Sequence, residues 1–185
     1  DIVDDMVCVT VGTGIGGGVV VDGRLHRGAH GVGSELGHVR MVPDGHLCGC
    51  GNRGCVEQYA SGRALVREAR ALADEHSVFA ERLLEMADGD PTLITGPMVT
   101  RAAQEGDEPS GELIADLGRW LGEALALFAA ILDPAVFVIG GGVSEAGQLL
   151  LAPTVAAYRR NLTGRGHRPV AEIRIATLGN DAGII

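Results

Sequence analysis

Three cysteines and the histidines before them form the most chemically specific stretch of the sequence. Cys48 and Cys50 are separated by one residue, Cys55 follows after a short glycine-rich turn, and His38 and His46 lie upstream. Three thiolates and one imidazole are a known ligand set for tetrahedral zinc. The glycines between the cysteines allow the tight backbone turns that wrap an ion. We therefore expect the three cysteines and one of the two histidines to bind a structural Zn²⁺.

Ordinary thiols or a disulfide are the alternative interpretation of these cysteines. Cys48 and Cys50 have a single residue between them, which leaves little room for disulfide geometry. The fourth cysteine, Cys8, stands apart in an apolar run and is expected in the core. Four cysteines arranged in this way do not resemble the framework of a secreted protein. Metal-binding thiols fit a reducing compartment, so we expect a cytoplasmic protein.

A carboxylate stands at each edge of this stretch, Glu35 before it and Glu57 after it. A metal-bound loop would fix both side chains in space. Carboxylates accept hydrogen bonds from neighbouring hydroxyl groups, and their charge strengthens those bonds. The pair could therefore serve a polyhydroxylated ligand. The competing interpretation for Glu57 is that it only stabilises the N-terminus of the helix that follows.

A second motif is the glycine-rich segment 12–18, which follows an apolar run at 6–11 that is typical of a strand. A dinucleotide-binding fingerprint needs a helix after the glycines, whereas here a strand follows at 19–21 and ends in an Asp22-Gly23 hairpin turn. Backbone amides in such a turn can cradle a phosphate, and the alternative is a plain flexible hairpin. The expected phosphate contacts are Gly12, Thr13, Gly14 and Gly16.

Three consecutive glycines, Gly140, Gly141 and Gly142, follow a continuous apolar run at 135–139. Such a run is typical of a strand that is buried on both faces. We expect the next helix to begin with Ser144 as its N-cap. Open α/β sheets bind ligands at the carboxyl ends of their strands, so these glycines are candidates for ligand contact. The alternative is a tight connection without a ligand.

Helices are expected to dominate the middle of the chain. The strongest amphipathic pattern predicts a helix over 112–132 whose apolar face packs on the sheet. That face consists of Leu113, Leu117, Trp120, Leu121, Ala124, Leu127, Phe128 and Ile131. Further expected elements are helices over 61–72, 77–86, 95–104 and 144–161, and strands over 39–42 and 172–177. Residues 105–109 are expected to form a linker, and residues 165–168 a solvated basic loop.

Composition restricts the class of protein. The chain has 185 residues, of which 46% are hydrophobic, so it can bury one good core and reads as one domain. The formal net charge of -9 argues against binding to nucleic acid or to an anionic membrane. No apolar run approaches the roughly 20 residues that a membrane-spanning helix needs. We therefore expect neither a nucleic-acid nor a membrane partner for this segment.

The segment Glu35-Leu-Gly-His38, followed by Cys48-Gly-Cys50-Gly-Asn-Arg-Gly-Cys55-Val-Glu57, resembles the signature of the ROK family of sugar kinases and repressors. Within that family it is similar to bacterial glucokinases, and the likeness runs from Val7 to the last residue. The resemblance implies an α/β fold of the actin-like ATPase (ribonuclease H-like) type. It implies that residues 1–185 are the C-terminal lobe of a kinase, without the N-terminal lobe and the last helix. It also favours His38 over His46 as the zinc ligand.

The resemblance further implies ATP-dependent phosphorylation of glucose at its 6-hydroxyl, with Mg²⁺ accompanying ATP. Glu35, His38 and Glu57 would bind the sugar, and the second ring nitrogen of His38 would stay free to donate a hydrogen bond. The three glycines at 140–142 would contact the adenosine part of the nucleotide. The chain would associate as a homo-oligomer. The general base is an aspartate expected upstream, so no catalytic residue is assigned and the isolated chain is expected to be inactive.

Two other functions stay open. The same family contains sugar-responsive transcriptional repressors, in which the sugar-binding residues are kept while the phosphate loops decay. Both glycine-rich segments are intact here, which favours a kinase. Mannose, fructose or an N-acetylhexosamine could replace glucose as the substrate. A zinc-stabilised interaction domain without a ligand would leave both glycine segments unexplained. The Asn180-Asp181 pair near the end is not assigned a catalytic role.

Overall fold

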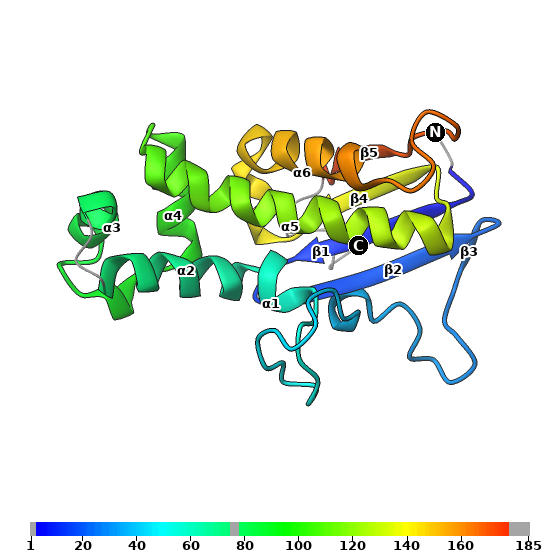
Figure 1. Cartoon of the computed structure of the whole chain (residues 1–185), viewed down its shortest axis with the longest axis horizontal. Coiled ribbons are helices and arrows are strands. Elements are labelled where there is room, and N and C mark those ends of the chain that lie inside the picture. The colour runs from blue at the N-terminus through cyan, green and yellow to red at the C-terminus, as the bar shows by residue number, and fades with distance from the viewer. Residues whose placement is uncertain (1–2, 75–77, 178–185) are drawn as a thin grey trace.

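In residues 3–74 and 78–177, which the computed structural model describes, five strands form one mixed sheet (Figure 1). The strands span Met6–Val11 (β1), Ile15–Val21 (β2), Arg24–Leu25 (β3), Val136–Gly140 (β4) and Glu172–Ile175 (β5). Their order is β3-β2-β1-β4-β5. β1 is antiparallel to β2 and parallel to β4, which is parallel to β5. This arrangement agrees with the predicted ribonuclease H-like α/β fold.

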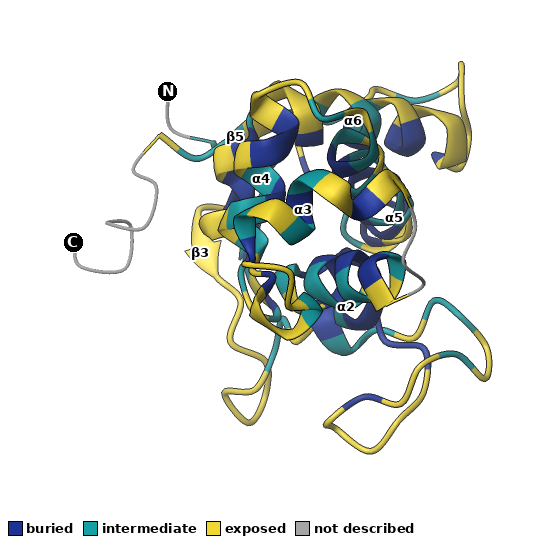
Figure 2. Cartoon of the chain, turned by 90° about the vertical axis from the view of Figure 1, so that its left-hand side faces the viewer, coloured by how far each residue is buried: buried dark blue, intermediate teal, exposed yellow. Residues whose placement is uncertain are grey.

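Six helices are described, of which the last two cover one face of this sheet (Figure 1). They span Glu57–Ala60 (α1), Gly62–Asp74 (α2), Glu81–Met86 (α3), Gly96–Gln104 (α4), Glu108–Leu132 (α5) and Gln148–Asn161 (α6). Short 3-10 turns span Leu36–His38 (η1), Val78–Ala80 (η2), Pro91–Leu93 (η3) and Gly142–Ala146 (η4). α5 and α6 lie side by side, and α1 and α2 lie along the first part of α5 (Figure 1). Figure 2 shows that the buried residues of these helices lie on their inward sides.

Along β1, buried side chains alternate with more exposed ones, as expected for a strand with one covered face. Val7, Val9 and Val11 are buried beneath the helices. Cys8 therefore points to the opposite face, where it is only partly buried, so the expectation of a core thiol was wrong. The turn between β2 and β3 was predicted correctly: Asp22 and Gly23 both have positive φ, as a two-residue hairpin turn requires.

The long helix α5 begins four residues earlier than predicted. The Asp107 carboxylate accepts a hydrogen bond from the Ser110 amide at 3.0 Å and so caps the helix. Pro109 lies in the first turn, where its missing N–H costs no hydrogen bond. The segment 105–109 is thus partly helical and not a linker, because a proline at this position starts a helix instead of breaking it.

The predicted apolar face of α5 is covered along only part of its length. Leu117, Leu121 and Phe128 are buried, whereas Leu127 is 43% exposed and Ile131 is 76% exposed. α1 and α2 cover this side of α5 near its first half and end before its last turns (Figure 1). The periodicity alone could not indicate where that cover stops.

The middle helices follow the predicted pattern closely. The Ser61 hydroxyl accepts a hydrogen bond from the Ala64 amide at 3.3 Å and caps α2, at the start of the helix expected over 61–72. α4 begins after Thr95 and ends at Gln104, also as expected. The expected helix over 77–86 is a 3-10 turn followed by α3, and residue 77 lies outside the described residues. None of the described helices is both long and apolar enough to span a bilayer.

Three local predictions were wrong. Residues 39–42 form no strand among the described elements, only an isolated bridge between Arg40 and Cys55. Ser144 does not cap a helix: its hydroxyl donates to the Gly141 carbonyl within η4, and α6 begins at Gln148. The basic loop 165–168 is not simply solvated, because Arg168 pairs with the carboxylate of Asp133 at the end of α5.

The end of the chain is described only in part. β5 ends at Ile175, two residues earlier than predicted. The Asn180-Asp181 pair, to which no catalytic role was assigned, lies outside the described residues.

Candidate functional site

The four predicted metal ligands meet in one cluster. One ligand atom from each of His38, Cys48, Cys50 and Cys55 lies within 4.8 Å of all the others. His38 Nδ1 is 3.5 Å from Cys48 Sγ, and Cys50 Sγ is 3.7 Å from Cys55 Sγ. Two sulfurs bound to one tetrahedral zinc at about 2.3 Å stand about 3.8 Å apart. The donor set and its spacing therefore fit Zn²⁺.

His46, the alternative ligand, is not part of this cluster. Its ring packs against Tyr59 with the two ring centroids 5.3 Å apart. His38 is instead the last residue of the 3-10 turn η1, which places it in the cluster. The preference for His38, which rested on the family resemblance, agrees with this geometry.

The surroundings of the buried thiols explain why a bound cation would favour their thiolate forms. An amide hydrogen bond from Asn52 lowers the pKa of Cys50 to about 7, which favours its thiolate. Burial raises the pKa of Cys55 to about 12, so this sulfur holds its proton unless a positive charge compensates for the lost hydration. Burial also raises the pKa of Cys48. A bound divalent cation provides that compensation, and its binding releases protons.

Both predicted carboxylates lie next to His38. Glu35 Oε2 is 3.9 Å from His38 Nε2, and Glu57 Oε1 is 4.0 Å from His38 Nδ1. Glu57 Oε1 also lies 3.1 Å from Cys48 Sγ. The Glu57 side chain is 16% exposed and that of Glu35 is 68% exposed. With Nδ1 directed to the sulfurs, Nε2 faces Glu35 and stays free for a ligand, so three predicted substrate residues share one locus.

The glycine turn after β1 is shorter than predicted. β2 begins at Ile15, so only Gly12, Thr13 and Gly14 form the turn. Gly16 lies in β2, paired with Thr10. The strand glycines serve a different purpose, since a β-carbon on Gly17 would lie 2.4 Å from the Ser34 carbonyl oxygen. They let the segment that leads to Glu35 pack closely on β2.

The shortened turn is anchored to the start of α2. The Gly12 carbonyl accepts a hydrogen bond from the Gly62 amide at 2.7 Å, and the Thr13 carbonyl accepts one from the Arg63 amide at 3.3 Å. On its other side, a β-carbon on Gly14 would lie 2.7 Å from Glu57 Oε2. The turn therefore directly adjoins the buried carboxylate.

The second glycine segment lies beside the first. β1 and β4 are parallel neighbours, with Thr10 opposite Gly140, so both strands end at the same edge. Gly141 has a φ of 87°, and a β-carbon there would lie 2.5 Å from the Val11 carbonyl oxygen. Only glycine fits such a close approach. Segments that are more than 120 residues apart thus meet at one edge of the sheet, where the first of them also adjoins Glu57.

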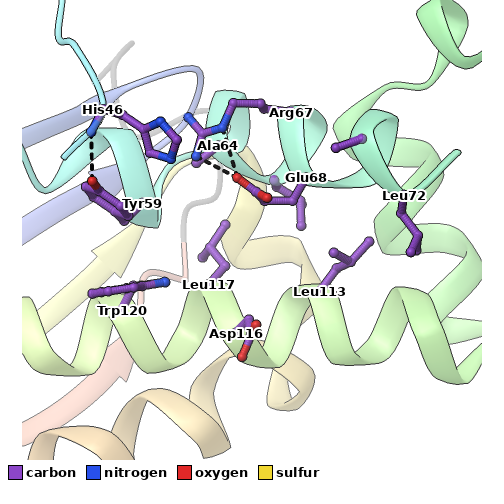
Figure 3. Close-up of a pocket in the computed structure, with 12 residues that line it drawn as sticks. His46, Tyr59, Ala64, Arg67, Glu68, Leu72, Leu113, Asp116, Leu117 and Trp120 are labelled. Carbon is purple, nitrogen blue, oxygen red and sulfur yellow. Dashed lines mark hydrogen bonds and ion pairs between the residues drawn. The ribbon is translucent and has the colours of Figure 1, made fainter. Parts of the chain in front are cut away.

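A groove of about 460 Å³ lies between α2 and α5, apart from this locus (Figure 3). At one end its wall contains His46, Tyr59 and Trp120, and the ring centroids of Tyr59 and Trp120 are 4.9 Å apart. The sequence analysis missed this aromatic contact. No local signal in the sequence indicates it, because Tyr59 and Trp120 are 61 positions apart.

Comparisons with known proteins agree with this geometry. The ROK family profile matches residues 2–185. The chain is 48% identical over 181 residues to a glucokinase of Streptomyces coelicolor, covering 98% of this chain and 57% of that protein. It therefore spans somewhat more than half of that relative's length.

Two solved structures are similar in fold. One is a ROK family glucokinase from Streptomyces griseus in complex with glucose and AMPPNP, with a TM-score of 0.93 and 47% identity over 98% of this chain and 58% of that one. The other is a ROK family transcriptional regulator, a homologue of the E. coli MLC protein, with a TM-score of 0.76 and 30% identity over 93% and 42% of the two chains. These similarities confirm the predicted fold class. The chain belongs to the ROK family.

Proposed function

We propose that this chain is the C-terminal lobe of a glucokinase, which transfers the terminal phosphoryl group of ATP to the 6-hydroxyl of glucose. One observation carries the proposal: Glu57 lies beside the metal-ligand cluster on one side and beside the glycine turn after β1 on the other. A sugar held by Glu57 would thus stand next to a phosphate held by that turn. The similarity to two Streptomyces glucokinases supports this assignment.

The sugar is held through charge-assisted hydrogen bonds. Glu35 and Glu57 accept from sugar hydroxyls, and His38 donates or accepts through Nε2. Zn²⁺, when bound, supplies a rigid link between His38 and the three cysteines and takes no part in phosphoryl transfer. The low exposure of Glu57 strengthens its bonds, because water competes less well there. Glu35, which is more exposed, contributes a weaker contact at the rim.

The nucleotide phosphates are cradled by backbone amides. The Gly12 amide already donates to the Gly14 carbonyl at 3.0 Å, so phosphate contact falls mainly on Thr13 and Gly14. Gly16, in β2, is the weakest of the predicted contacts. Residues 140–142 border the adenosine part. Mg²⁺ would accompany ATP and neutralise charge that develops on the transferred group.

The rest of the catalytic machinery belongs to another part of the protein. The general base, an aspartate, would come from an N-terminal lobe that precedes this chain, so the chain alone would not turn over glucose. A cytoplasmic location and a homo-oligomeric state complete the proposal. A sugar-responsive repressor is the second candidate, favoured by the similarity to a ROK family transcriptional regulator.

A coupled assay of the full-length protein separates these candidates. With ATP and Mg²⁺, we expect phosphorylation of glucose at lower concentrations than of mannose, fructose or N-acetylmannosamine. Glucose binding by calorimetry without any turnover would favour the repressor. Turnover of another hexose in preference to glucose would keep the kinase and change its substrate. If the protein neither binds nor phosphorylates any hexose, the proposal is refuted.

A further inference from the structure

The aromatic contact beside the groove joins the metal-binding loop to the body of the protein. Tyr59 lies on α1, two residues after Glu57, and its ring lies between those of His46 and Trp120 (Figure 3). The Trp120 ring belongs to the core helix α5, and the Arg119 guanidinium lies 5.1 Å from its centroid. The result is a continuous series of tilted ring contacts from α5 to the loop that precedes Cys48.

The hydroxyl of Tyr59 adds a directional link to this stack. It accepts a hydrogen bond from the His46 amide at 2.9 Å. The His46 carbonyl in turn accepts from the Gly54 amide at 2.9 Å, next to the metal ligand Cys55. Gly45 is so close that a β-carbon there would lie within 1.9 Å of the Tyr59 hydroxyl oxygen. Tyr59 is therefore fitted to one backbone position of the loop.

The loop is otherwise connected mainly to itself: the Met41 and Val42 amides donate to the Gly54 carbonyl, and the Arg40 side chain donates to the Arg53 carbonyl. Among the described residues, its regular pairing consists of two isolated bridges, Arg40 with Cys55 and Leu47 with Arg53. These bonds connect positions within the loop, whereas the Tyr59 hydroxyl connects the loop backbone to α1. Tyr59 makes such a contact from the same short helix that carries Glu57, so it couples the position of the loop to the position of that carboxylate.

We propose that Tyr59, which packs against Trp120, is a positioning residue for sugar binding. It fixes the position of the metal-binding loop (residues 39–56) relative to Glu57. The proposal rests on the proposed function, since it assigns Glu57 to the sugar. Tyr59 itself touches neither His38 nor the glycine turns in any contact described above. Its effect reaches the sugar through the backbone of His46 and through α1.

Two variants of the full-length protein test this role. Tyr59→Phe keeps the ring contacts and removes the hydroxyl, which leaves the His46 amide without that partner. Trp120→Leu removes the surface on which the Tyr59 ring rests. Tyr158→Phe is the matched control, because Tyr158 is the other tyrosine, is buried in α6, and its hydroxyl also contacts backbone, at Ala171.

Glucose affinity by calorimetry and zinc release to a chelator are the two measurements. For Tyr59→Phe we expect the glucose Kd to rise about three- to ten-fold, the scale of one lost hydrogen bond, with the KM for ATP unchanged. Zinc should leave several-fold faster, although one equivalent is still bound at the start. Trp120→Leu should change both in the same direction, and Tyr158→Phe should change neither.

A failure of the positioning role can be distinguished from a failure of the proposed function. If wild-type protein neither binds nor phosphorylates glucose, the kinase assignment fails, while zinc release still reports on the loop. If wild-type protein binds glucose and Tyr59→Phe has the same glucose Kd, the positioning role is refuted. An equal loss of glucose affinity in Tyr158→Phe would also refute it, because the effect would then be one of general stability.

Discussion

Gly14 stands against Glu57 so closely that a β-carbon on Gly14 would lie 2.7 Å from Oε2 of the carboxylate. The turn that follows β1 and the carboxylate that begins α1 therefore share one boundary. In the proposed kinase this boundary is where the phosphate and the sugar hydroxyl meet. In that kinase, the absence of a side chain at position 14 would serve the sugar site as well as the phosphate turn.

Gly14→Ala should weaken glucose binding. The new methyl group must displace the Glu57 carboxylate, so a hydroxyl partner loses its acceptor, at a cost of about ten-fold in Kd. Gly12→Ala is the control, because a β-carbon on Gly12 has no atom within 4 Å and its backbone φ is not positive. Calorimetry with glucose and no nucleotide makes the comparison. Equal glucose affinity in both variants would contradict the contact between Gly14 and Glu57.

The metal cluster predicts one zinc per chain. Elemental analysis should find one equivalent, and X-ray absorption should find sulfur ligands at about 2.3 Å and an imidazole nitrogen at about 2.0 Å. Cys55→Ser should lose the metal and lower the melting temperature, because structural zinc contributes directly to folding. Cys8→Ser should retain it, since Cys8 lies in β1, away from the cluster. Loss of zinc in Cys8→Ser, or its retention in Cys55→Ser, would contradict the ligand assignment.

Replacing either of two glycines of α5 with alanine should change the stability of the protein, in opposite directions for the two positions. A β-carbon on Gly122 would lie 2.3 Å from the Thr154 carbonyl oxygen of α6, so Gly122→Ala should destabilise the fold by roughly 1–3 kcal/mol. Gly111→Ala meets no atom within 4 Å and should stabilise the helix by up to about 1 kcal/mol. Denaturant unfolding of each variant measures both. A stabilised Gly122→Ala would contradict the close packing of α5 on α6.

Much of this architecture could be predicted because its signals are local. The strand over 6–11, the Asp22-Gly23 turn and the start of the helix near Ser61 each depend on neighbouring residues, and all three are present. The spacing of the three cysteines is equally local. The three thiol ligands could therefore be predicted without knowledge of the fold, whereas the choice of His38 over His46 rested on the family resemblance.

The errors arose where a residue's role depends on a distant partner. Gly16 and Gly17 were assigned to a turn, but they lie in β2, where Gly17 makes room for Ser34. Ile131 fitted the periodicity of α5 and is exposed, because no described helix covers it there. The contact of Tyr59 with Trp120 joins residues 61 positions apart, and no local pattern indicates it.

Glu57→Gln tests the central claim that Glu57 binds the sugar. The substitution keeps the shape of the side chain and removes its charge, so charge-assisted hydrogen bonds to sugar hydroxyls become weaker. Glu57 is not among the metal ligands, so the zinc content should not change. The competing role is helix stabilisation, since Glu57 is the first residue of α1. That role alone predicts a lower melting temperature with unchanged glucose affinity.

Titration of glucose into the full-length Glu57→Gln protein is the most direct measurement. Glu68→Gln, on the surface of α2, is the matched control for the loss of one glutamate charge. We predict that the glucose KM and Kd of Glu57→Gln rise about ten-fold or more while the KM for ATP and the zinc content stay unchanged. A Glu57→Gln protein that binds glucose as tightly as wild type and Glu68→Gln would remove Glu57 from the sugar site and contradict the account.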